Sequence, residues 1–184
     1  MKTGITDKRS MSYILHCTKK LIDRIKAPLA PLDSAPTSTC LLGTWYATAL
    51  FWKPQLALFV HEETLLPVLM PLAPASSLTE RFPAHLAEVL HALNIDARFI
   101  TTEIAAMGQV QYAKTSSRSV LGIMNQFSYL AEGYREHLET SDLIELSLKL
   151  AHVPCSPLYK RETFPDRELH RWIKENWEFS GSTD

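Results

Sequence analysis

The residues best suited to chemistry gather between Lys114 and Asn125, where basic and hydroxyl side chains precede an amphipathic stretch. Lys114 and Arg118 carry positive charge, and Ser117 and Ser119 offer hydroxyl groups. The N–H groups in the first turn of a helix lack intrahelical partners, and that end of the helix dipole is positive. The segment is therefore typical of a site that binds an anion such as phosphate.

A helical wheel separates the side chains of this segment into two faces, at about 100° per residue. One stripe is polar and holds Arg118, Gly122, Asn125 and Tyr129, whereas the opposite one is apolar and holds Val120, Met124, Phe127 and Ala131. Because a glycine leaves room above the helix backbone, we expect Lys114, Ser117, Arg118 and Asn125 to line one concave site with Gly122 at its floor. The alternative is the solvated face of an amphipathic helix whose serines cap its start.

Two further lysines complete the set of candidate ligand-binding residues. Lys19 and Lys20 follow Thr18, which is a suitable N-cap for a short helix. They add to the charge of Lys114 and Arg118 if the two helix starts face one pocket. The ligand would then carry a phosphate, as a nucleotide or an RNA end does.

Recognised catalytic and metal-binding motifs are missing from the sequence. It has no Gly-x-Ser-x-Gly elbow, no phosphate loop, no His-Glu-x-x-His and no zinc-spaced Cys/His cluster. The segment His61-Glu62-Glu63 is interpreted as a solvated turn, and no cofactor is expected. Cys17, Cys40 and Cys155 are widely spaced and odd in number, so we expect free thiols in a reducing compartment.

The composition argues against a dedicated nucleic-acid-binding protein and against a membrane-spanning protein. The 19 Lys and Arg residues nearly balance the 20 Asp and Glu residues, so no basic excess points to nucleic acid. The most apolar region, 56–74, is broken by charges and prolines and is too interrupted to span a membrane. The first ten residues are polar and lack a signal peptide, which predicts a cytoplasmic protein. Met1 and Met11 are both candidates for the natural start.

The elements that must position these residues are predicted from hydrophobic periodicity. Strands are expected at 13–17, 44–52, 55–60, 65–70, 97–100 and 110–114. Helices are expected at 19–26, 76–93, 117–137, 142–151 and 166–177, with irregular segments at 27–42 and 153–165. Segment 45–51 is also compatible with a short helix, since Ala47, Ala49 and Leu50 favour one.

These elements predict an α+β fold with an antiparallel meander over Thr44–Met70. The connections within the meander are too short for crossovers, and the helices are expected to pack mostly on one face of the sheet. One domain is predicted over 13–178, with disordered ends at 1–12 and 179–184.

Three motifs resemble a bacterial family, the domain of unknown function 6933. They are Thr18-Lys19-Lys20-Leu21, the segment from Trp45 to Phe51, and the segment from Lys114 to Asn125. The resemblance spans roughly residues 13–131, and the third motif is the specific one. Thr48, Ile123 and Gln126 replace the Asn, Ser and Asp that are usual in the family. The resemblance implies the fold and the region to inspect but no activity.

Two functional hypotheses remain open. The first is a non-catalytic binding or interaction module with a protein or small-molecule partner, favoured by the lack of catalytic motifs and by the apolar side of 166–177 with its two tryptophans. The second is an enzyme or regulated binder that acts on a phosphate-bearing ligand at the start of the 117–137 helix.

Overall fold

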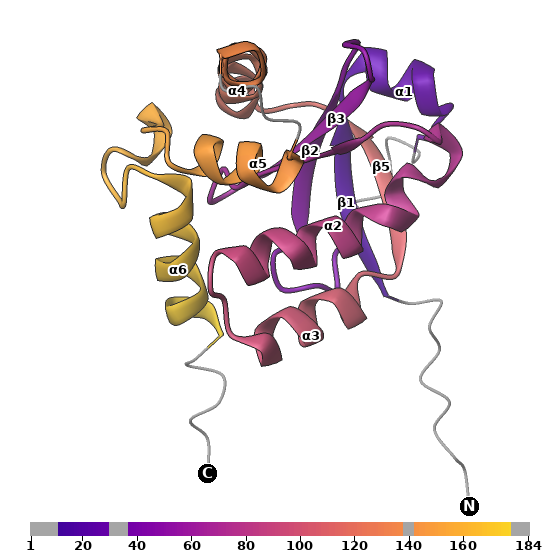
Figure 1. Cartoon of the computed structure of the whole chain (residues 1–184). Coiled ribbons are helices and arrows are strands. Elements are labelled where there is room, and N and C mark those ends of the chain that lie inside the picture. Colours follow the sequence, from indigo (N-terminus) through magenta and orange to yellow (C-terminus); the bar gives the residue numbers. More distant parts are fainter. Residues whose placement is uncertain (1–10, 30–36, 138–141, 178–184) are drawn as a thin grey trace, which may run out of the picture.

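A five-stranded mixed sheet forms the centre of the computed structural model, which describes residues 11–29, 37–137 and 142–177 (Figure 1). The strand order is β4-β3-β2-β1-β5. The strands are β1 (Ser12–Cys17), β2 (Thr44–Leu50), β3 (Leu56–His61), β4 (Pro67–Pro71) and β5 (Gln109–Lys114). Of the ends expected to be disordered, 1–12 and 179–184, residues 1–10 and 179–184 lie outside the described residues, whereas Ser12 belongs to β1.

The predicted meander is confirmed, because β2, β3 and β4 pair antiparallel in sequence order. Segment 45–51 therefore does not form a helix. The rest of the sheet is parallel, since β1 lies between β2 and β5 and runs in the same direction as both. A helical crossover joins β1 to β2, and parallel neighbours require such a connection.

Helices connect and cover the strands (Figure 1). Their bounds are α1 (Lys19–Ile25), α2 (Leu78–Ala92), α3 (Ala97–Ala106), α4 (Arg118–His137), α5 (Leu143–Ala151) and α6 (Pro165–Asn176). The predicted strand at 97–100 is wrong, because these residues begin α3. The Asp96 carboxylate accepts the Arg98 N–H at 2.8 Å and caps the helix.

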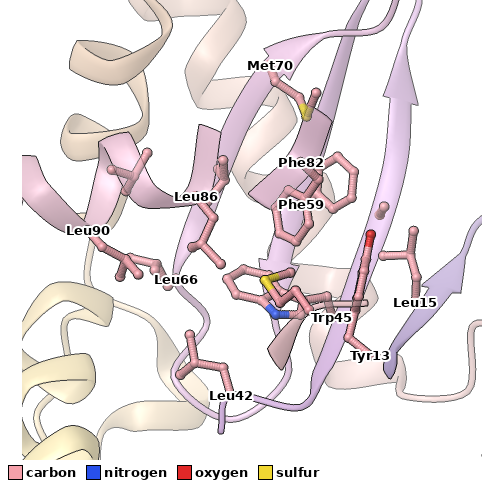
Figure 2. Close-up of a cluster of buried hydrophobic side chains, with 14 of the residues drawn as sticks. Tyr13, Leu15, Leu42, Trp45, Phe59, Leu66, Met70, Phe82, Leu86 and Leu90 are labelled. Atoms are coloured by element: carbon pink, nitrogen blue, oxygen red, sulfur yellow. The ribbon is translucent and has the colours of Figure 1, made fainter. Parts of the chain in front are cut away.

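Alternate side chains along the strands build two hydrophobic clusters on opposite faces of the sheet. The larger cluster contains Tyr13, Trp45 and Phe59 from the strands, and Phe82 of α2 stacks on Phe59 with ring centroids 4.0 Å apart (Figure 2). Helices α1, α2, α3 and α6 contribute to this cluster. The apolar side of α6 is therefore core, and Trp172 on it is buried.

The second cluster covers the other face, where α4 packs on Tyr46, Leu58 and Val60. Helix α5 contributes to both clusters, through Leu146 and Leu150 here and Ala151 in the first. The expectation of helices mostly on one face thus misses α4. The apolar stripe of α4 could not show which face of the sheet it would meet.

Close contact at the start of β5 holds this edge strand against β1. The Gln109 N–H donates to the Met11 carbonyl at 2.7 Å. A Cβ on Gly108 would collide with that carbonyl oxygen and would lie 2.8 Å from the Met11 Cβ. Glycine is therefore required where the chain enters β5, and the register then sets Lys114 beside Cys17.

Candidate functional site

A cavity of about 430 Å³ opens at the carboxyl ends of the parallel strands β1 and β5. We call it the β1–β5 crevice, and it is lined by Cys17, Lys19, Ile22, Asp23, Leu29, Lys114 and Thr115. Cys17 and Lys114 are paired end residues of the two strands, and Lys19 begins α1. Its volume lies within the range of small-molecule sites, roughly 300–1,000 Å³.

The chain leaves the two strands in opposite directions at this crevice. After β1 it enters α1, whose Leu21 belongs to the larger cluster, and after β5 it enters α4, whose Phe127 belongs to the cluster on the other face. Such divergence separates the loops beyond the strand ends, and ligands of open α/β sheets bind at this kind of switch point. The topology therefore accounts for the cavity.

Positive charge exceeds negative charge in the crevice. Lys19 and Lys114 are opposed by one carboxylate, Asp23, which accepts a hydrogen bond from the Lys19 ammonium at 2.6 Å. Among the residues that the structure describes, the exposed Lys114 ammonium has no hydrogen-bond or ion-pair partner. It is therefore available to an anionic ligand.

The floor of the crevice is apolar and contains a thiol. Ile22 and Leu29 supply aliphatic surface, and the buried Cys17 Sγ lies 3.8 Å from the Leu15 carbonyl oxygen. Burial raises the pKa of the Cys17 thiol to about 12, because the thiolate would lose its hydration. The thiol is thus protonated at neutral pH and is a weak nucleophile there.

Side chains on the opposite face of the sheet fix the turn between β5 and α4. The His16 ring stacks on Tyr46 with centroids 4.6 Å apart, and its Nδ1 lies 2.7 Å from the Lys114 carbonyl oxygen. The Tyr46 and Ser116 hydroxyls are 3.2 Å apart. Because a carbonyl only accepts, Nδ1 must carry the proton and donate it. These contacts hold the backbone of Lys114 in place.

The predicted residues on α4 lie apart from the crevice lining. The Ser117 hydroxyl accepts the Val120 N–H at 3.3 Å and caps α4. Arg118, Ser119, Gly122 and Asn125 are exposed. A Cβ added to Gly122 would meet no described residue beyond the local backbone of α4 within 4 Å, so this glycine is not held by close packing.

Of the eight predicted residues, the structure brings Lys19 and Lys114 together at the crevice. Lys20 is exposed and is not among the lining residues. The prediction missed the remaining lining residues. Asp23 carried a signal, because it stands four positions after Lys19, the spacing at which helical side chains form ion pairs. Leu29 could not be found locally, since its bridge to Tyr112 of β5 joins distant parts of the chain.

A second cavity, of about 470 Å³, lies near the start of β5, where Thr79 of α2 and Tyr112 contribute to its walls. Their hydroxyls are already paired with each other at 3.1 Å. Among the described residues that line this cavity, Glu80 is the charged one. The cavity therefore lacks the positive charge of the crevice.

The prediction that His61-Glu62-Glu63 is a solvated turn holds for the two glutamates and is wrong for His61. Glu62 and Glu63 are exposed, but His61 is fully buried under Trp45, with ring centroids 5.1 Å apart. The Glu63 carboxylate accepts the Trp172 indole N–H at 2.8 Å. The turn therefore anchors α6, which sequence reasoning did not foresee.

The structure bears on the expectations about cysteines, metal sites and membrane spans. Cys17, Cys40 and Cys155 are all free and buried, which confirms that none is paired. Within the described residues, no group of three His, Cys, Asp or Glu side chains could hold a metal ion. In the same part of the chain, no helix is both long enough and apolar enough to cross a membrane.

A protein family described as a domain of unknown function (DUF6933) matches residues 14–168. This match confirms the resemblance inferred from the three motifs and extends beyond it to α6. It includes most of β1 and the whole of β5 and α4. No curated protein matches the chain.

Proposed function

This chain belongs to the DUF6933 family, and we propose that it is a non-catalytic binding module for a small phosphate-bearing molecule in the β1–β5 crevice. One observation carries the proposal: two lysines from distant parts of the sequence, Lys19 and Lys114, line one cavity at the switch point of the sheet. Lysine ammonium groups bind phosphates as compact point charges.

The shape of the crevice supports a ligand larger than a bare ion. Its walls combine the two ammonium groups with the aliphatic side chains of Ile22 and Leu29. A nucleotide has a charged part and a flat apolar part of matching character. Its phosphate would neutralise Lys114, and its base would cover the apolar surface.

The lining supports binding more than catalysis. Its thiol belongs to Cys17, whose raised pKa keeps it protonated. Its carboxylate belongs to Asp23, which is held by Lys19 at 2.6 Å. The two lysines can orient an anion, but neither Cys17 nor Asp23 is set up to attack it.

The test is a thermal-shift and calorimetric titration of the full chain with inorganic phosphate, pyrophosphate and nucleoside phosphates. A ligand at 100 times its dissociation constant should stabilise the fold by about 2.7 kcal/mol. The melting temperature should then rise by several degrees, at roughly 2–4 °C per kcal/mol for a chain of this size. Salt should weaken the binding, because both lysines are near solvent.

The matched variants are Lys114→Gln and Lys20→Gln, which remove one ammonium each. Lys114→Gln should weaken binding at least about tenfold, the equivalent of 1.4 kcal/mol. Lys20→Gln should leave binding unchanged, because Lys20 lies on the same helix as Lys19 but outside the lining. If no phosphate compound binds, or if both variants weaken binding equally, the proposal is wrong.

A further inference from the structure

The outward face of α4 is a polar stripe that the crevice leaves unused. It holds Arg118, Gly122, Asn125, Tyr129 and Glu132, all exposed at helical spacing. Tyr129 is 78% exposed, the largest exposure among the large hydrophobic side chains described. A glycine inside an exposed helix makes that helix less stable than an alanine would. Neither feature helps the fold of the isolated chain.

We infer that this stripe, the α4 face, is where two copies of the chain pair around a two-fold axis. In a two-fold contact, residue i of one copy meets residue j of the other, and j meets i in return. The α4 face fits this requirement, because its two ends carry side chains of opposite charge. Its Arg118 lies near the start of the helix and its Glu132 lies toward the end.

The register of this pairing is set by a large residue and a gap. When two α4 helices lie antiparallel with the axis between Asn125 and Gln126, Tyr129 of each copy lies opposite Gly122 of the other. Apart from its chain neighbours and the local backbone of α4, no atom of the described residues lies within 4 Å of a Cβ placed on Gly122, so the gap can receive a ring. Tyrosine is enriched at the centres of interfaces, where its ring covers area with little loss of entropy.

The same register brings opposite charges together. Arg118 of one copy falls beside Glu132 of the other, and the symmetry makes two such pairs. Within the described residues neither side chain has an ion-pair partner of its own. The two helix dipoles also run in opposite directions, which is favourable. One helix from each copy forms a small interface, so the dimer should be weak and concentration dependent.

Sedimentation velocity of the full chain, from roughly 1 µM to 1 mM, tests the inference. The wild-type chain should shift from monomer to dimer across this range. Tyr129→Ala and Arg118→Glu should each raise the dissociation constant at least about tenfold. Arg118→Glu combined with Glu132→Arg should restore the dimer, because the swap exchanges the two charges and keeps their complementarity.

Two matched controls separate the α4 face from general surface effects. Tyr159→Ala removes another exposed tyrosine, and Lys20→Glu makes the same change in net charge as Arg118→Glu. Both should leave the dissociation constant unchanged. A wild-type chain that stays monomeric throughout, or a charge swap that fails to restore association, overturns the inference.

Cross-linking gives an independent readout of the register. The native cysteines are all buried, so an introduced surface thiol is the one that mild oxidation reaches first. Asn125→Cys places a thiol close to the two-fold axis and should yield a disulfide-linked dimer. Lys20→Cys should remain monomeric, and equal cross-linking of the two variants would contradict the register.

Discussion

At the scale of single residues, two buried titratable side chains hold the peptide groups around Leu42. The Glu103 carboxylate accepts the N–H groups of Leu41 at 2.6 Å and Leu42 at 3.2 Å. The His61 Nε2 lies 2.8 Å from the Leu42 carbonyl oxygen, and the Thr64 N–H donates to His61 Nδ1. Because the carbonyl only accepts, Nε2 carries the proton and the imidazole is neutral.

This neutral histidine makes stability depend on pH. Burial lowers the pKa of His61 to about 4 from an ordinary value of about 6.5. The unfolded chain therefore takes up a proton before the folded chain does. The contribution of neutral His61 to the free energy of unfolding is complete above pH 6.5. As the pH falls to about 4, this contribution of roughly 3 kcal/mol is lost. Urea denaturation at pH 7, 5.5 and 4.5 measures this loss.

The variant His61→Gln isolates the effect, because glutamine keeps a donor for Leu42 and does not titrate. Its unfolding free energy should fall less steeply across this pH range than that of the wild type. Glu103 is present in both chains, so its contribution to the pH dependence cancels in the comparison. The pKa of Glu103 is raised mainly by burial. A raised carboxyl pKa stabilises the fold on acidification, which is the opposite sign. Equal slopes in the two chains would mean that His61 does not titrate as described.

At the scale of elements, the two glycines of the β5–α4 region have opposite roles. Gly108 enters β5 where any Cβ would collide with Met11, whereas Gly122 lies in α4 with open space around it. Gly108→Ala should therefore destabilise the fold by about 1–3 kcal/mol through overpacking. Gly122→Ala should stabilise the monomer by about 0.5–1 kcal/mol through helix propensity.

Urea denaturation of both variants at low protein concentration measures the two effects. The wild type at the same concentration is the reference, so that association through the α4 face does not contribute. Loss of stability in both variants would show that the helix at Gly122 is packed rather than open.

Sequence patterns predicted the elements whose signals are local. The meander followed from its short connections, and α2, α4, α5 and α6 followed from helical periodicity. The error at 97–100 arose because Phe99 and Ile100 suggest a strand when the capping role of Asp96 is overlooked. The pairing of β1 with both β2 and β5 could not be predicted, since it joins segments that are far apart in the chain.

The candidate site was predicted in the same partial way. The basic residues were found by charge and position, but their distribution between the crevice and the α4 face depends on the direction in which the chain leaves β5. Lys114 faces the α1 side, while Arg118 lies in the helix that covers the other face. Lys114 and Arg118 are only four positions apart in the sequence, yet they lie on two different surfaces of the molecule.

At the scale of the whole molecule, the sheet joins its two hydrophobic clusters. Tyr46 and Trp45 are neighbours in β2 but belong to different clusters, and β3 and β4 alternate likewise. Neither cluster can lose its packing without disturbing strands that the other needs. Unfolding should therefore be a single cooperative transition.

Two tryptophans report on the two sides separately. Trp45 is buried in the larger cluster, and Trp52 packs against the other, with Arg135 over its ring at 4.7 Å. In chains that keep only one of these tryptophans and carry phenylalanine at the remaining positions, fluorescence and circular dichroism should give the same urea midpoint. Different midpoints within one chain would show that the two faces unfold independently.

The mixed direction of the sheet has a consequence for the order in which the chain folds. The meander of β2, β3 and β4 closes short loops, whereas β1 and β5 must meet across the meander and the helices α1, α2 and α3. Closure of long loops costs more entropy and slows folding. The crevice should therefore form late, after the meander, and a molecule bound in it would chiefly slow unfolding and leave the rate of folding almost unchanged.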